Sequence, residues 1–340
     1  MEKEKIKKKL KLAIYWGAAC GGCCVSVLDL HENILQVLDH ADLVFWPIAL
    51  DFKYEDVEKM PDGSIDVTLF NGAIRNSENE EIAILLRQKS KLLVAYGSCA
   101  YMGGIPGLAN LSGKESLLDR VYHTESTVNE ENVKPEPHFS AWEGDLNIPM
   151  FYDEVKRLKD VVCVDYSIPG CPPQSERLLE VFNLLVSGAV LPTKESVIGA
   201  YDKSQCDECP RIKSEDRVIR EFHRPWEVED DNVTCFLEQG ILCLGPATRG
   251  GCGYRCILGG APCRGCYGPP ENVADPGAKM MSAISTLVES NDTEEIRKII
   301  GQLVDPAGTF YRFSIPASII RKKISLPATV HRMSYNHVSK

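Results

Sequence analysis

The sequence predicts an α/β protein with a parallel sheet in its N-terminal half, followed by an irregular domain rich in cysteine and glycine with only short helices. The first part rests on apolar runs of strand length that alternate with amphipathic runs of helical length, a pattern typical of a parallel sheet covered on both faces. The second rests on segment 240–270, which holds five cysteines among nine glycines and four prolines. Such a segment folds around something other than a hydrophobic core, and its irregularly spaced thiolates indicate an inorganic centre, with an iron-sulfur cluster the leading candidate.

The N-terminal elements follow one another in a regular order. Residues 10–16 (LKLAIYW) form an apolar run that we expect to be a buried strand, and the amphipathic run 25–38 after the next glycine-rich turn is expected to be a helix. Segment 174–187, which two prolines begin, has the same helical character. By the same reasoning the remaining elements are strands at 43–46, 65–70, 91–96 and 161–166, and a helix at 80–88.

Two segments interrupt or follow this alternation. Residues 110–150 have weak periodicity and many polar residues and prolines, so we interpret them as an insertion that decorates the sheet, with a short helix at 114–122. From Cys206 onward, cysteine and glycine predominate. Near the end the pattern again predicts helices, at 277–289 and 293–304. We therefore place a boundary near Glu195, which divides the chain into domains at 1–195 and 196–340.

Composition and charge exclude several classes of protein. The net charge of −10 argues against a nucleic-acid-binding chain, although residues 1–11 (MEKEKIKKKLK) form a basic run that we expect to be a solvated terminus. No window of 18 apolar residues occurs, so no membrane span is predicted. The basic run is not followed by the apolar stretch of an export signal, so we expect a cytoplasmic protein, in which fourteen cysteines indicate metal ligation rather than disulfides.

Four cysteines directly follow predicted strands. Cys20 and Cys23 lie in the loop after the first strand, and Cys99 and Cys171 lie after two later ones. The carboxyl ends of parallel strands meet at one edge of a sheet, so three distant loops can place these four thiolates around one point. Helix amino termini nearby would offset their negative charge. The sequence therefore predicts a single-cluster site at this edge.

The motifs that carry these cysteines resemble those of the small subunit of nickel-iron hydrogenases, and most of all the cytoplasmic methyl-viologen-reducing, deazaflavin-non-reducing type of methanogens. The resemblance covers nearly the whole chain and implies a flavodoxin-like N-terminal domain with a proximal four-iron, four-sulfur cluster. No flavin is expected, because cysteines occupy the loop where a flavin phosphate would need Ser, Thr and Gly donors. The motifs matched to the proximal cluster are Cys20-Gly21-Gly22-Cys23, Gly97-Ser98-Cys99 and Gly170-Cys171-Pro172-Pro173.

The resemblance implies two further ligand sets in the second half. Those matched to the distal cluster are Cys206, Cys209, Cys235 and Cys243, and those matched to the medial cluster are Cys252, Cys256, Cys263 and Cys266. Two positions depart from the better-known pattern: Cys206 replaces a histidine, and Cys256 supplies a fourth medial ligand where a proline is common. Three [4Fe-4S] clusters are expected. The pairing of Cys243 and Cys256 between the last two clusters stays open, because neighbouring ligand sets can interdigitate.

The resemblance also implies the role of the chain. Electrons from hydrogen oxidation in a separate [NiFe]-hydrogenase large subunit would pass through the three clusters to an iron-sulfur adaptor and on to heterodisulfide reductase. No catalytic residue is expected here, because this chain lacks the two pairs of nickel-binding cysteines that the family carries near the ends of the large subunit.

Other interpretations of the cysteines remain open at this point. The two pairs Cys206/Cys209 and Cys263/Cys266 could form a zinc ribbon. Cys24 and Cys163 belong to none of the three ligand sets and are interpreted as core thiols.

The second functional hypothesis is a complex-I-like or stand-alone electron carrier. The tandem Cys23-Cys24 resembles a complex I subunit that is related to this family and holds one cluster. The eight cysteines after residue 200 argue against this hypothesis, because one cluster needs only four ligands.

Overall fold

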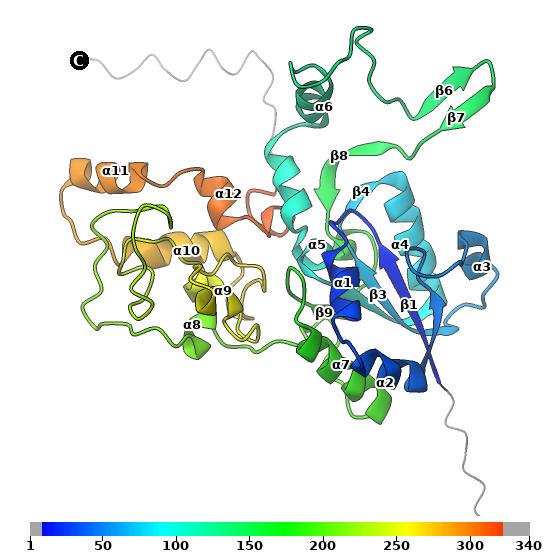
Figure 1. The fold of residues 1–340 in the computed structure, drawn as a ribbon, viewed down its shortest axis with the longest axis horizontal. Coiled ribbons are helices and arrows are strands. Elements are labelled where there is room, and N and C mark those ends of the chain that lie inside the picture. Colours follow the sequence, from blue (N-terminus) through cyan, green and yellow to red (C-terminus); the bar gives the residue numbers. More distant parts are fainter. Residues whose placement is uncertain (1–8, 322–340) are drawn as a thin grey trace, which may run out of the picture.

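The computed structural model describes residues 9–321, and a five-stranded parallel sheet forms the centre of its N-terminal half (Figure 1). The strand order is β2-β1-β3-β5-β9, all parallel, which is the order of flavodoxin-like folds. The predicted fold class is therefore confirmed. The strands are β1 (Leu10–Trp16), β2 (Ala41–Phe45), β3 (Ile65–Asn71), β5 (Ser90–Tyr96) and β9 (Tyr166–Ile168).

Helices cover both faces of this sheet (Figure 1). Successive side chains of a strand point to opposite faces, so Ile14 packs in one core and Tyr15 in the other. The Ile14 core is completed by α1 (Gly22–Leu28), α2 (Asn33–His40) and α7 (Ser175–Ser187). The Tyr15 core is completed by α3 (Tyr54–Glu58) and α4 (Ser77–Lys89). With both faces covered, the carboxyl edge of the sheet is where its loops converge.

Two predicted elements of this half were wrong in detail. The predicted helix 25–38 is two helices, α1 and α2, separated by a turn in which His31 has a left-handed φ of 51°. The predicted strand 161–166 begins only at Tyr166, because the start of that segment is still in a turn: the amides of Val161 and Val162 both donate to the Leu158 carbonyl (3.1 Å each). As a result Cys163, interpreted as a core thiol, is exposed.

The predicted insertion leaves and rejoins the sheet beside one antiparallel strand pair. Helix α6 (Lys114–Tyr122) has the predicted bounds, but the pattern gave no signal for the hairpin that follows it. Strand β8 pairs with β4 at the base of the insertion, and β6 pairs with β7 in the hairpin. The elements of this region are β4 (Ile74–Asn76), α5 (Ser98–Met102), η1 (Ile105–Leu111), β6 (His138–Ala141), β7 (Gly144–Asn147), β8 (Phe151–Lys156) and η2 (Leu158–Asp160).

The second half is built from short helices and loops around its own core, as expected. Residues such as Phe236, Ile241 and Met280 fill this core, and between residues 196 and 321 the structure has isolated bridges but no named strand. The two predicted helices near the end are present and end a few residues early. The elements are α8 (Gln205–Glu208), η3 (Gly245–Ala247), α9 (Arg255–Leu258), α10 (Pro276–Ser285), α11 (Thr293–Gly301), α12 (Pro306–Phe310) and η4 (Ile315–Ala317).

The end of the described chain returns to the first half. Helix η4 packs on η1 and α5, and the side chain of Asn110 donates a hydrogen bond to the Arg321 carbonyl (3.1 Å). No helix in residues 9–321 is long and apolar enough to cross a membrane. Most of the basic run expected to be a solvated terminus lies outside the described residues.

Candidate iron-sulfur sites

The four cysteines predicted at the carboxyl edge of the sheet lie together. The pKa of the Cys99 thiol is raised to about 12, mainly by burial and in addition by the neighbouring thiols of Cys171 and Cys20. Burial also raises the pKa of Cys23, with Cys99, Cys171 and Cys20 as additional causes. We call these four residues the first group. Cys20 and Cys171 are exposed, so this group opens to the surface on one side.

Glycines leave the room that the first group occupies. A Cβ atom on Gly97 would lie 2.3 Å from the Cys23 sulfur, and one on Gly104 would lie 2.4 Å from the Cys99 sulfur. Both glycines have positive φ angles, 86° and 57°, that other residues rarely adopt. Backbone atoms rather than side chains therefore surround these thiols. This leaves the space that an inorganic cluster bound by thiolates on several sides would need.

A second group consists of Cys206, Cys209, Cys235 and Cys243. The pKa of Cys206 is raised to about 12: burial is the largest cause, the thiols of Cys243, Cys235 and Cys209 also raise it, and Lys213 lowers it. The amine of Lys213 also donates a hydrogen bond to the Cys206 carbonyl. A Cβ on Gly245 would lie 2.9 Å from the Cys206 sulfur, so this position too is kept clear of side chains.

A third group consists of Cys252, Cys256, Cys263 and Cys266. The pKa of Cys266 is raised to about 12, mainly by burial and in addition by Cys252 and Cys256. Burial also raises the pKa of Cys263, followed by Cys243 and Cys266. Cys256 therefore has its thiol neighbours in this group. The pKa of Cys243 is raised to about 11, mainly by burial, and the thiols that contribute to this increase are Cys235 and Cys209 of the second group.

The three groups adjoin one another through direct contacts. The Ser98 hydroxyl, beside Cys99, donates to the carbonyls of Gly170 (2.8 Å) and Cys266 (2.5 Å), so it joins the first group to the third. The backbone amide of Cys263 donates to the Cys243 sulfur (3.3 Å), which joins the third group to the second. The spatial order is therefore first, third, second.

Sequence reasoning missed several polar residues of these sites. The Cys252 thiol contacts the Glu208 carboxylate (sulfur to oxygen 3.7 Å), which also accepts the Gly251 amide (3.0 Å). Glu208 lies between two matched cysteines and carried no signal of its own, and neither did Ser98. Within residues 9–321, no three His, Cys, Asp or Glu side chains are placed so that they could hold a single metal ion between them, so the three cysteine groups do not have the arrangement of a one-ion site.

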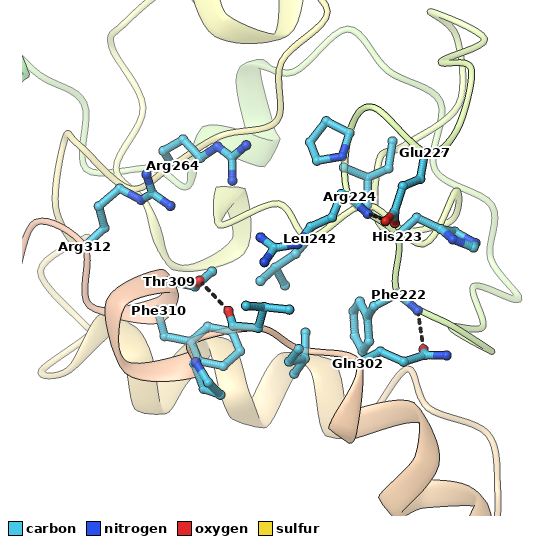
Figure 2. Close-up of a pocket in the computed structure, with 15 residues that line it drawn as sticks. Phe222, His223, Arg224, Glu227, Leu242, Arg264, Gln302, Thr309, Phe310 and Arg312 are labelled. Carbon is cyan, nitrogen blue, oxygen red and sulfur yellow. Dashed lines mark hydrogen bonds between the residues drawn. The ribbon is translucent and has the colours of Figure 1, made fainter.

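A cavity of about 320 Å³ lies beside the second and third groups (Figure 2). Arg224, Arg264 and Arg312 contribute its cationic wall, and residues such as Leu242 and Phe310 its apolar wall. Arg264 directly follows Cys263, and Leu242 directly precedes Cys243. Burial lowers the pKa of Arg264 and Arg312 lowers it further, whereas Cys243 and Cys256 raise it. Positive charge is therefore concentrated next to both groups.

The two cysteines left outside the ligand sets have different environments. Cys24 is 3% exposed, as predicted for a core thiol, and its sulfur accepts a hydrogen bond from the Asn71 side-chain amide (3.2 Å). The same amide donates to the Tyr15 carbonyl (2.7 Å). Cys163 is exposed, and its carbonyl accepts a hydrogen bond from Arg87.

Comparison with known proteins assigns the family. The chain is 41% identical to the iron-sulfur subunit of the F420-non-reducing hydrogenase of Archaeoglobus profundus, over 93% of this chain and 99% of that protein. The chain belongs to the small subunits of [NiFe] hydrogenases of the F420-non-reducing type. A subunit of the F420-non-reducing hydrogenase of Methanothermobacter marburgensis is 39% identical over 93% of this chain and 98% of that protein. A family model described as the NADH ubiquinone oxidoreductase 20 Kd subunit matches residues 20–185.

A solved structure has the same fold. The recombinant [NiFeSe] hydrogenase from Desulfovibrio vulgaris Hildenborough aligns with a TM-score of 0.50 and 17% identity, over 83% of this chain and 98% of that one. The small-subunit family makes this chain part of an oxidoreductase, in which a hydrogenase small subunit pairs with a large subunit. Its many cysteines imply iron-sulfur clusters.

Replacing Gly97 should disturb the first group alone. We expect Gly97→Ala to displace the Cys23 sulfur, because the new methyl group would lie 2.3 Å from it, and to lower the iron content of the anaerobically purified protein. Gly63→Ala is the matched control: Gly63 also has a positive φ, but nothing lies within 4 Å of the added Cβ. Equal iron contents in the two variants would contradict this role of Gly97.

An ion pair next to Cys235 predicts a pH-dependent loss of stability. Arg211 donates to both oxygens of the Asp230 carboxylate (2.6 and 2.5 Å) and to the Thr234 carbonyl (2.9 Å). The hydrogen bonds from Arg211 are the largest cause that lowers the pKa of Asp230 to about 2. Because this pKa lies below the unfolded value of about 3.9, the pair contributes stability above that value and loses it as the pH falls toward 2.

We therefore expect Asp230→Asn to lower the free energy of unfolding by about 1–2 kcal/mol at pH 7. Circular dichroism during thermal unfolding should show this difference shrink as the pH falls below about 4. Asp51→Asn is the control, since the Asp51 side chain is 90% exposed and pairs with Lys53 at the surface. A difference that is constant with pH would contradict the assignment.

Proposed function

We propose that this chain relays electrons from hydrogen oxidation in the large subunit through three [4Fe-4S] clusters to an acceptor outside the hydrogenase. The observation that carries the proposal is the contact of three groups of four cysteines in the order first, third, second. A cluster bound by four thiolates supplies one-electron transfer. In this proposal the first group holds the proximal cluster, the third the medial and the second the distal.

The donor chemistry of the three groups supports this assignment. Each group offers four thiols, and burial raises the pKa of Cys99, Cys206 and Cys266 to about 12, so uncoordinated thiolates would be costly here. Coordination to a metal deprotonates a thiol outright and removes that cost. We further propose that Cys243 belongs to the distal set, because Cys235 and Cys209 are the thiols that raise its pKa, and that Cys256 belongs to the medial set, because it raises the pKa of Cys252 and Cys266.

The chain's own residues would set how readily each site takes up an electron. The amides that face sulfur include those of Gly22 on Cys20 (3.4 Å) and Cys263 on Cys243 (3.3 Å), and they stabilise negative charge on the thiolates. The arginine cavity adds positive charge beside the second and third groups. The Glu208 carboxylate, next to Cys252, acts in the opposite sense.

The same proposal assigns the domains, the location and the outer partners. The proximal site belongs to a flavodoxin-like domain at 1–195, and the other two sites belong to an iron-sulfur domain at 196–340. We propose a cytoplasmic complex in which the second group faces an iron-sulfur adaptor that leads to heterodisulfide reductase. The support is that this group lies at the end of the series opposite the first group, and that the relatives are F420-non-reducing hydrogenases.

Iron analysis of the anaerobically purified protein tests the proposal. Three four-iron clusters require about twelve irons per chain, because each cubane binds four irons through four thiolates. About four irons per chain would instead support a chain with a single cluster in the region matched by the complex I family model, and zinc in place of iron would support the zinc ribbon.

The assignment of Cys256 has a specific consequence. Without its fourth thiolate, the medial cluster should lose one iron, so Cys256→Ala should show the electron paramagnetic resonance signal of an oxidised three-iron cluster and retain about eleven of twelve irons. Cys24→Ala is the matched control, because Cys24 is a core thiol outside the three groups. A three-iron signal in the Cys24 variant and none in the Cys256 variant would contradict the ligand assignment.

A further inference from the structure

The hairpin β6–β7 has one polar face and one apolar face. His138 pairs with Asn147 and Ser140 with Asp145, and their side chains hydrogen-bond across the strands (2.8 and 2.7 Å). Phe139 pairs with Leu146 on the opposite face. The polar side chains thus find their hydrogen-bond partners within the hairpin, whereas the apolar side chains Phe139 and Leu146 pack only against each other.

This apolar face lacks cover within residues 9–321. On this face Phe139 is 58% exposed and Leu146 is 61% exposed, and Trp142, in the turn that joins the two strands, is 93% exposed. Figure 1 shows the hairpin standing away from the body of the molecule. A two-stranded hairpin alone is at best marginally stable in water, and grouped exposed apolar side chains mark interaction surfaces. The face therefore fits a protein partner.

The insertion that carries the hairpin is fixed to the rest of the chain beside Cys99 of the first cysteine group. The Asn110 side chain accepts the Val155 amide (2.7 Å) and donates to the Val155 carbonyl (3.0 Å), so it ties the start of the insertion to β8. Val155 in turn packs in a small core with Cys99 and Ala73. Just before β8, the Met150 amide donates a hydrogen bond to the Ser77 hydroxyl, and the Met150 carbonyl accepts one from the Ser77 amide. Both ends of the insertion are therefore anchored near the first group.

We propose that Phe139, Trp142 and Leu146 dock onto the large subunit and hold it against the first cysteine group. This inference rests on the proposed function, in which electrons enter at the first group. The large subunit must then lie close to Cys20 and Cys171, which are exposed at the surface. An electron acceptor would instead bind at the second group, at the other end of the series. A second copy of this chain would have no reason to bind at the first group, where electrons enter.

The proposal also accounts for the composition of the face. A few central residues, among which tryptophan is enriched, provide most of the binding energy at protein interfaces, and truncation of one of them costs about 2 kcal/mol or more. The hydrogen-bonded polar face stiffens the strands that carry them, so less freedom is lost on binding. Trp142 lies at the tip, where it would reach farthest into the partner.

The test uses the complete hydrogenase complex with a tag on this chain. We expect the double variant Phe139→Ser/Trp142→Ser to bind the large subunit at least about thirty-fold more weakly than the wild type, as measured by dissociation during dilution. Its iron content should equal that of the wild type, because the substituted side chains contact none of the cysteine groups. The matched control is Val190→Ser, which alters an apolar side chain that is 96% exposed elsewhere.

A second measurement does not depend on the variant. Hydrogen exchange of residues 138–147 should be slower in the complex than in the isolated wild-type chain. Unchanged exchange, unchanged affinity of the double variant, or a loss of the adaptor or of self-association in place of the large subunit would each overturn the proposal. A wild-type complex with about twelve irons per chain and normal affinity for the variant would leave the proposed function standing and reject this docking site alone.

Discussion

The close burial of cysteine thiols is the constraint on which the rest of the structure depends. A thiolate inside a protein is costly, and neighbouring thiolates repel one another, so the pKa of Cys99, Cys206 and Cys266 rises to about 12. No pure hydrophobic core would gather thiols in this way at the end of a sheet. A metal centre draws electron density from the sulfurs that bind it. The thiolates are then stabilised as ligands, and their mutual repulsion is offset. The loops around the thiols then need to be held by something other than apolar packing.

Two devices hold these loops. Backbone approaches the sulfurs where side chains are absent, as at Gly97 and Gly104, and hydroxyl or amide groups join loops that are far apart in sequence. Ser98 is the central example, because its hydroxyl lies between the Gly170 and Cys266 carbonyls and so ties the sheet edge to the second half of the chain. The parallel sheet supplies the rigid base for this arrangement. Its carboxyl edge is where ligand-binding loops of such folds gather.

The sequence predicted the elements in which a residue pattern repeats. It did not predict features that depend on one contact between particular residues. Alternating apolar runs predicted the sheet, and the helix at 114–122 has the predicted bounds. The strand expected at 161–166 failed because the Val161 and Val162 amides are bonded in a turn to the Leu158 carbonyl, which no periodicity reveals. The cysteine motifs indicated which residues gather. The neighbours of Cys243 and Cys256, and the role of Ser98, depend on contacts between distant segments and needed coordinates.

The central claim concerns the number and type of metal centres that this one chain binds. Mössbauer spectroscopy of the complex, with iron-57 supplied to this chain, measures both together. If the chain holds three four-iron clusters, all of its iron should be in cubane form. Reduction of each cluster should then change one third of the iron signal, because each site holds the same number of irons. Iron confined to one cubane, or a chain whose second-half cysteines bind zinc, would contradict the account.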